Sequence, residues 1–278
     1  MMNTVMMMKT ARMIDLSIAL GLALGAARAA AVDFPTVPVA RCAPDAVLAG
    51  TACIDKYEAS VWRVPNATTT NAGLLKTIQF GRATRADLIA GGAMQLGTTG
   101  DDYAPCTRNG QNCANDIYAV SLPGEMASSQ ITWFQAQEAC GNAGKRLPTN
   151  AEWQVGANGT PDPGPDDGTT DCNSNSDGQS LTGARSRCVS ARGAFDMVGN
   201  LAEWVADWVP FPTNCLGWAS FSNDDMCLAG ASTTANSPAA LVRGGAFAGV
   251  GGHGAGPLAV HPFAPFHAAT FIGFRCAR

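Results

Sequence analysis

The chain has 278 residues, of which 46% are hydrophobic and only 14% are charged, and its formal net charge is −4. This length and apolar content are sufficient for a sizeable buried core. No stretch is basic enough to predict nucleic-acid binding, and no run is long and apolar enough to predict a membrane span.

Residues 1–29 have the pattern of a secretory signal peptide. Lys9 and Arg12 provide positive charge, and an apolar stretch follows from Leu16 to Ala26. The small residues of Ala27-Arg28-Ala29 form a typical cleavage site, so we expect the mature chain to begin close after it. We therefore expect a secreted or periplasmic protein, with surface display as a further option.

Ten cysteines follow this segment, and an even number in an exported chain predicts disulfides rather than zinc binding or thiol chemistry. Closeness in sequence favours four local bridges, although sequence alone does not fix the connectivity: Cys42–Cys53, Cys106–Cys113, Cys172–Cys188 and Cys215–Cys227. The two cysteines left over, Cys140 and Cys276, would form a long-range bridge worth about 4–5 kcal/mol in the chain-entropy model.

The first part of the mature chain gives weak structural signals. Residues 30–52 are rich in proline and alanine and predict irregular structure. Apolar and charged residues nearly alternate over 53–62, which predicts a strand. Residues 63–130 contain many turn-forming residues and little periodicity, so we expect loops with short strands there.

Two helices are predicted next, because Thr132 with Gln135 and Thr149 with Glu152 have the spacing of capping boxes. Residues 159–187 consist largely of Gly, Pro, Asp, Asn and Ser and predict a long surface loop.

After this loop, a turn at Gly199-Asn200 is expected to lead into a strand anchored by Trp204 and Trp208. Residues 209–239 again predict loop.

The tail, residues 241–278, begins and ends with short apolar runs that predict two buried strands. Between them, residues 246–271 hold all three histidines of the chain and four phenylalanines, but no Asp, Glu, Lys, Asn, Gln or Ser. Two interpretations fit this composition. The segment is either a binding surface carried on loops or a glycine-rich part of the core.

Seven short motifs now carry a resemblance: Cys53-Ile54-Asp55-Lys56-Tyr57-Glu58; Thr132-Trp133 through Cys140; Gly144-Lys145-Arg146-Leu147-Pro148-Thr149 with Glu152-Trp153; Val198-Gly199-Asn200 with Glu203-Trp204; Asp207-Trp208; Arg243-Gly244-Gly245; and Gly273-Phe274-Arg275-Cys276. In this order, over residues 53–278, the chain resembles the formylglycine-generating enzyme (sulfatase-modifying factor) family, which has an α+β variant of the C-type lectin fold. We therefore expect one loop-rich, disulfide-stapled domain of this type over residues 30–278.

The resemblance implies that Cys140 pairs with Cys276, in agreement with the pair left over above. It also implies a structural calcium site at the Gly-Asn turn. The side chains of Asp196 and Glu203 and the carbonyls of Gly199 and Leu201 would be its ligands, and calcium prefers such oxygen ligands.

The resemblance also bears on catalysis. The enzymes of the family carry two reactive cysteines after the Arg-Gly-Gly motif, which bind copper and activate oxygen. This chain has no cysteine from Ala246 to Arg275, so no copper is expected, because Cu(I) prefers thiolate ligands. Some relatives use histidines and non-haem iron, for which His253, His261 and His267 are candidates, but no carboxylate lies near them in sequence.

The tail is more similar to the variable region of proteins diversified by retroelements. Every residue between Gly244 and Arg278 is of a type whose codon can end in C, as adenine-directed randomisation favours. This resemblance implies a non-catalytic binder of an unknown protein or glycan, with residues 244–272 as the candidate variable region. Its exposed contacts would be Phe247, Ala248, Val250, His253, Ala255, His261, Phe263, Phe266, His267, Ala268, Thr270 and Phe271.

Two other functions stay open at this point. One is an oxidoreductase of the same family that uses copper or non-haem iron, and the other is a structural envelope protein whose tail is core.

Overall fold

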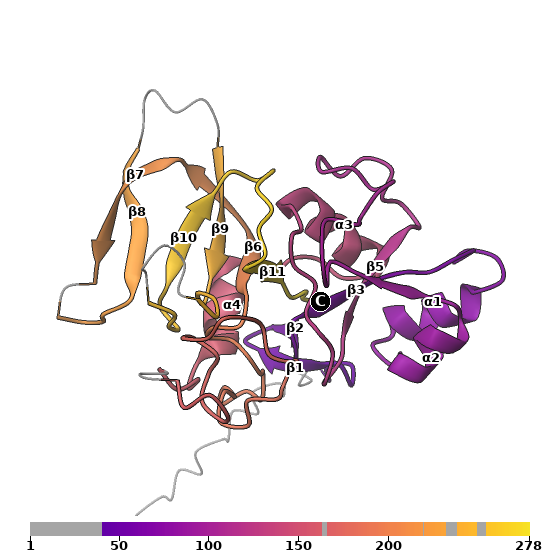
Figure 1. The fold of residues 1–278 in the computed structure, drawn as a ribbon, viewed down its shortest axis with the longest axis horizontal. Helices are drawn as coiled ribbons and strands as arrows, with labels where there is room; N and C mark the ends of the chain where they lie inside the picture. The colour runs from indigo at the N-terminus through magenta and orange to yellow at the C-terminus, as the bar shows by residue number, and fades with distance from the viewer. Residues whose placement is uncertain (1–40, 163–165, 219, 232–237, 249–253) are drawn as a thin grey trace, which may run out of the picture. The chain divides into compact units, whose positions relative to one another are not determined.

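The computed structural model describes residues 41–278, apart from 163–165, 219, 232–237 and 249–253. The expected signal peptide and the candidate contacts Val250 and His253 lie outside the described residues. Helices and strands are mixed in the described part (Figure 1), which confirms the α+β prediction. None of its helices combines the length and the apolar character that crossing a membrane requires.

The first half of the domain contains two small sheets. Strands β1 (Ala46–Ala49) and β2 (Ala52–Asp55) form an antiparallel hairpin. Strand β3 (Ala59–Arg63) pairs antiparallel with both β4 (Met94–Leu96) and β5 (Ile117–Ser121). The single strand expected over 53–62 is therefore two strands.

Helices α1 (Ala72–Gln79) and α2 (Arg85–Ala90) form where loops and short strands were expected. Helix α2 begins with a capping box in which Asp87 takes the place that Glu or Gln usually holds. The hydroxyl of Thr84 accepts a hydrogen bond from the Asp87 backbone amide over 3.2 Å, and this local signal is visible in the sequence.

Helices α3 (Trp133–Asn142) and α4 (Asn150–Ala157) confirm the two predicted helices. In α3 the Thr132 hydroxyl accepts a hydrogen bond from the Gln135 amide over 3.2 Å, and the Gln135 side chain accepts one from the Thr132 amide over 3.1 Å. These bonds satisfy two amides that a helix start would otherwise leave unpaired.

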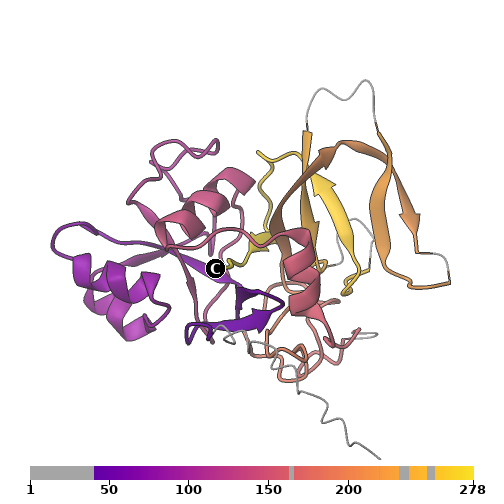
Figure 2. The ribbon, with the colours of Figure 1, turned by 180° about the vertical axis from the view of Figure 1, so that it is seen from behind.

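The second half of the domain forms a six-stranded sheet in the order β11-β6-β9-β10-β8-β7. Its strands are β6 (Ala202–Pro210), β7 (Pro212–Gly217), β8 (Asp225–Ala231), β9 (Pro238–Arg243), β10 (Val260–Phe263) and β11 (Ile272–Phe274). The pairs β11–β6 and β10–β8 are parallel, and the other neighbours are antiparallel. Both views of the ribbon show β7 and β8 at the far edge of this sheet from β11 (Figures 1 and 2).

The sheet confirms three predicted strands and adds three that were not expected. Strand β6 confirms the tryptophan-anchored strand, and β9 and β11 confirm the strands that enclose the tail. Strands β7 and β8 replace the loop expected over 209–239, and β10 lies inside the tail itself.

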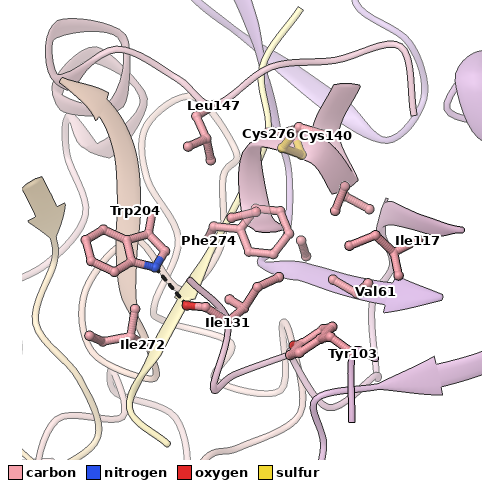
Figure 3. Close-up of a cluster of buried hydrophobic side chains, with 14 of the residues drawn as sticks. Val61, Tyr103, Ile117, Ile131, Cys140, Leu147, Trp204, Ile272, Phe274 and Cys276 are labelled. Atoms are coloured by element: carbon pink, nitrogen blue, oxygen red, sulfur yellow. Dashed lines mark hydrogen bonds between the residues drawn. A yellow bond between two sulfur atoms is a disulfide. The ribbon is translucent and has the colours of Figure 1, made fainter. Parts of the chain in front are cut away.

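The largest hydrophobic cluster joins the end of the tail to α3 and β6 (Figure 3). Phe274 and Trp204 are fully buried in it, and the Trp204 indole donates a hydrogen bond to the Ile131 carbonyl over 3.0 Å. The Cys140–Cys276 disulfide lies in this cluster and links α3 to the end of the tail. All ten cysteines pair as the sequence predicted.

Candidate binding surface

After β9, the tail backbone is fixed by hydrogen bonds to segments far away in sequence. The Phe247 amide donates to the Asn200 carbonyl over 3.0 Å, and the Phe247 carbonyl accepts from the Ser176 amide over 2.9 Å. Further along, the Ala269 carbonyl accepts a hydrogen bond from the Gln130 amide over 2.9 Å. The tail is therefore a loop with a defined backbone path on both sides of the segment that is not described.

Some of the candidate contacts are accessible. Phe266 is 60% exposed, and Ala248 and Thr270 are also exposed. Phe247 and Ala268 are half-buried. We call these five residues the tail face.

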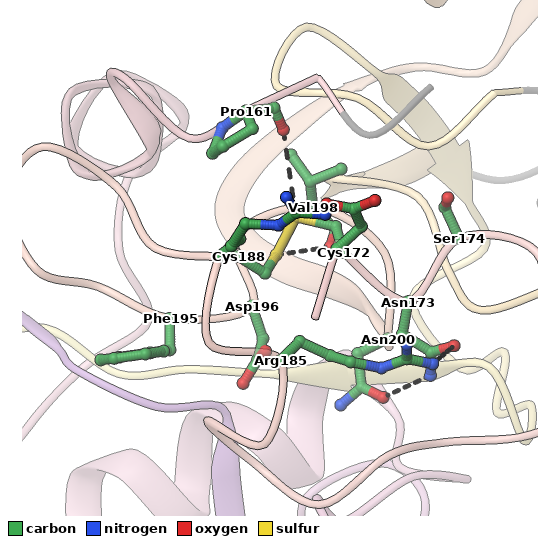
Figure 4. Close-up of a disulfide and its surroundings, with 12 residues drawn as sticks. Pro161, Cys172, Asn173, Ser174, Arg185, Cys188, Phe195, Asp196, Val198 and Asn200 are labelled. Atoms are coloured by element: carbon green, nitrogen blue, oxygen red, sulfur yellow. Dashed lines mark hydrogen bonds and ion pairs between the residues drawn. A yellow bond between two sulfur atoms is a disulfide. The ribbon is translucent and has the colours of Figure 1, made fainter. Parts of the chain in front are cut away.

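Two candidates are buried, so the expected exposure is wrong for them. Ala255 is 8% exposed, because it packs against Val198 and the Cys172–Cys188 disulfide, which lie side by side in Figure 4. His261 is 6% exposed, because it lies on β10 between two neighbouring strands. Its Nδ1 atom is 3.4 Å from the Cys227 sulfur.

Phe263 and Phe271 are half-buried and pack against the main core. The Phe263 ring meets Trp204 edge to face, with 6.5 Å between ring centroids, and stacks on His267 at 5.1 Å with an interplanar angle of 7°. Burial, and secondly the charge of Arg108, lower the pKa of His267. One part of the tail therefore belongs to the core, whereas another part is accessible.

An aromatic cluster lies next to the tail and was not predicted from the sequence as part of the site. Trp133, Phe134 and Trp208 meet edge to face, with ring centroids 5.1–5.8 Å apart, and Trp208 is 40% exposed. The Trp133 amide donates to the Pro265 carbonyl over 3.0 Å, which places the exposed Phe266 loop beside the start of α3. The aromatic pair directly after the helix cap Thr132 was the signal available in the sequence.

The histidines do not form a metal site in the described part of the chain. His261 lies within the six-stranded sheet, whereas His267 stacks on Phe263. Among the described residues, no group of three or more His, Cys, Asp and Glu side chains is arranged to hold a metal ion.

At the Gly-Asn turn, the oxygens of Glu203 are engaged by a buried guanidinium. Arg275 donates from Nε and Nη2 to the two Glu203 oxygens over 2.7 and 2.6 Å, and the Trp153 indole donates to Oε2 over 2.7 Å. One Asp196 oxygen accepts a hydrogen bond from the Gly183 amide over 2.6 Å. The guanidinium also donates to the Phe195 carbonyl over 2.8 Å.

This arrangement does not fit the calcium site that the resemblance implies. Calcium takes six to eight oxygen ligands, whereas the oxygens of Glu203 here already accept three hydrogen bonds, two of them from a permanent cation. A calcium ion that shared this carboxylate would lie close to the guanidinium and be repelled by it. Calcium binding by Asp196, Gly199, Leu201 and Glu203 was expected from the resemblance alone, and a binding measurement is needed to test it.

We expect calcium to leave the thermal stability of the protein unchanged. A ligand at 100 times its Kd stabilises the fold by about 2.7 kcal/mol, which corresponds to a Tm increase of roughly 5–10 °C for a domain of this size. Scanning calorimetry in excess calcium and in EDTA should therefore give Tm values that agree within about 1 °C. An increase of several degrees that Glu203→Gln abolishes would restore the calcium site.

Comparison with known proteins identifies the family of the chain. A model of the sulfatase-modifying factor enzyme 1-like domain matches residues 101–278. No curated protein sequence matches the chain.

Several solved structures align with parts of the chain. The Major Tropism Determinant M1 variant is 18% identical, with a TM-score of 0.44 over 84% of this chain and 52% of its own. PvdO from Pseudomonas aeruginosa is 19% identical, with a TM-score of 0.38 over 82% and 80%. Treponema denticola variable protein 1 is 17% identical, with a TM-score of 0.33 over 55% and 71%. The chain spans about half the length of the Major Tropism Determinant variants.

Proposed function

Because the chain belongs to the sulfatase-modifying factor enzyme 1-like family, with its C-type lectin-like fold, we propose that it is a non-catalytic member that binds a protein or glycan ligand through the tail face. The observation that carries this proposal is the division of the tail into exposed and inward residues. Ala248, Phe266 and Thr270 are exposed, while Phe263 and Phe271 hold the same segment to the core.

A fixed backbone favours binding, because a loop that is already ordered loses less conformational entropy when a ligand docks. The bonds from Gln130 to Ala269 and from Trp133 to Pro265 fix the loop that carries Phe266 and Ala268. Side chains on such a loop can be exchanged without changing the contacts that hold it.

The neighbouring aromatic cluster enlarges the proposed surface. Trp208 and Phe266 offer large apolar contact areas, and aromatic residues of this kind contribute strongly at binding interfaces. The cluster belongs to α3 and β6, so it would supply constant contacts beside the exchangeable tail.

We do not favour the oxidoreductase alternative. All ten cysteines are engaged in disulfides, so the chain offers no thiolate to Cu(I), which prefers soft ligands. Stoichiometric copper or iron in the purified protein, together with oxygen consumption, would support that alternative.

The proposal also concerns how the tail sequence arose and in which compartment the protein is located. The residue types between Gly244 and Arg278 agree with diversification by a retroelement, which would leave an adenine-rich near-copy of the coding sequence beside the gene. Five disulfides are typical of an oxidising compartment and agree with a secreted or periplasmic protein.

A displayed library tests the binding surface. We would randomise the tail face and select for binding to lysozyme as a model protein probe. Most unselected clones should stay folded, and binders should emerge, because the buried core and the disulfides that hold the fold do not depend on these side chains.

The control is a second library, randomised at four inward tail positions, namely Ala255, His261, Phe263 and Phe271. This library should yield mostly unfolded clones, since these side chains are buried or packed on the core. Equal loss of folded clones from both libraries would assign the whole tail to the core and contradict the proposal.

A further inference from the structure

A pocket of about 380 Å³ opens where the tail face meets three other segments. Phe247 and Thr270 of the tail line it together with side chains that follow β4, precede α3 and belong to the long loop over 159–187. Its polar side chains include those of Thr98, Thr99, Gln130 and Gln179. No charged residue lines this pocket within the described part of the chain.

Gln179 gives this pocket an unusual polar group. Its Nε2 atom donates to the Thr270 carbonyl over 3.4 Å, which joins the long loop to the tail. Its Oε1 atom is buried and accepts no hydrogen bond from the described residues. A buried acceptor without a donor costs about 1–3 kcal/mol, so a position of this kind calls for a donor from a ligand or a water molecule.

The chemistry of the lining selects a class of ligand. Amide and hydroxyl side chains can both donate and accept hydrogen bonds, so they suit a ligand that carries several hydroxyl groups. The Phe247 ring adds an apolar surface, whereas a carboxylate, sulfate or phosphate would find no cationic partner in the lining. The volume is within the range of small-molecule sites.

We propose that this pocket binds a neutral hexose residue of a glycan, with Gln179 as a hydrogen-bond acceptor for a sugar hydroxyl. This inference rests on the proposed binding function and names the ligand class for it. The lining residues of the long loop, together with those after β4 and before α3, would select a hydroxyl-rich, uncharged ligand. The tail residues Phe247 and Thr270, which are exchangeable, would then decide which sugar fits.

Saturation-transfer NMR on the full chain tests the proposal with four neutral probes: methyl α-mannoside, methyl β-galactoside, methyl β-glucoside and N-acetylglucosamine. We expect at least one to bind with a Kd of about 1 mM or below. Gln179→Leu should weaken this binding about tenfold or more, since the sugar hydroxyl loses its acceptor. Its Tm should fall by at most a few degrees, because the substitution removes only the long hydrogen bond of 3.4 Å from Nε2 to the Thr270 carbonyl and no bond to Oε1.

Gln111→Leu is the matched control, because Gln111 is exposed and does not line the pocket, and it should leave sugar binding unchanged. The proposal is overturned if none of the four probes binds at about 10 mM. It is also overturned if a probe binds Gln179→Leu as tightly as it binds the parent protein. The library experiment separates the two ideas, because protein binders can still emerge there when every sugar fails.

Discussion

Replacing Arg275 with methionine is expected to lower the free energy of unfolding by about 3–5 kcal/mol, because it leaves buried carboxylates without their cation. The Arg275 side chain is 0% exposed and holds both oxygens of Glu203, which is itself 1% exposed. Asp196 and Glu58 lie in the same buried group. Burial raises the pKa of Asp196 to about 6 and holds the pKa of Glu58 well above its usual value.

Urea denaturation of Arg275→Met beside Arg187→Met gives the comparison. Arg187 forms ion pairs with Asp167 and Asp171, but its side chain is 62% exposed, so its replacement should cost at most about 1 kcal/mol. Equal effects of the two substitutions would show that the buried pair does not hold the end of the tail to the frame.

Removing the long-range disulfide is expected to produce the second large effect. The double variant Cys140→Ala, Cys276→Ala opens a bridge with a sequence separation of 136 residues. The chain-entropy model assigns about 5 kcal/mol to closing a loop of this length. The bridge lies in the main core beside Phe274, so its loss would release the final strand from α3.

The double variant Cys106→Ala, Cys113→Ala is the matched control, because its bridge spans a sequence separation of only 7 and is worth about 2 kcal/mol in the same model. Both variants would be compared by thermal and urea unfolding. A larger loss for the short bridge would contradict the importance that the structure gives to the tail anchor.

Elements whose structure depends on residues close together in the sequence could be predicted from the sequence. Helices α3 and α4 begin at capping boxes, in which the cap residue and a residue three positions later bond each other's backbone amides. Close spacing identified the local disulfides for a similar reason, because a short loop brings its two ends together at small entropic cost.

Elements that depend on distant partners were missed. Strand β10 consists of Val260-His261-Pro262-Phe263, which has no strand pattern of its own, and it forms between β9 and β8. This placement buries His261, whose side chain was predicted from the sequence to be exposed. The β7–β8 hairpin was also missed, because its glycine, proline and asparagine residues resemble those of a loop.

The arrangement of the candidate site also depends on distant partners and could not be predicted from the sequence. The composition of residues 246–271 does not show which side chains are exposed, because phenylalanine occurs both at exposed positions and at positions that face the core. Phe266 is 60% exposed, whereas Phe263 packs between Trp204 and His267. The pocket beside Gln179 joins four segments far apart in sequence, so no local pattern could have indicated it.

The most direct measurement is the Tm of a single variant in which Phe247, Ala248, Phe266, Ala268 and Thr270 are all replaced by serine. If these side chains form an exchangeable face on a frame that other contacts hold, the Tm should stay within about 4 °C of the parent. A fall of about 10 °C or more, comparable to that of Phe263→Ser, would show that the tail face is core and would contradict a binding role for it.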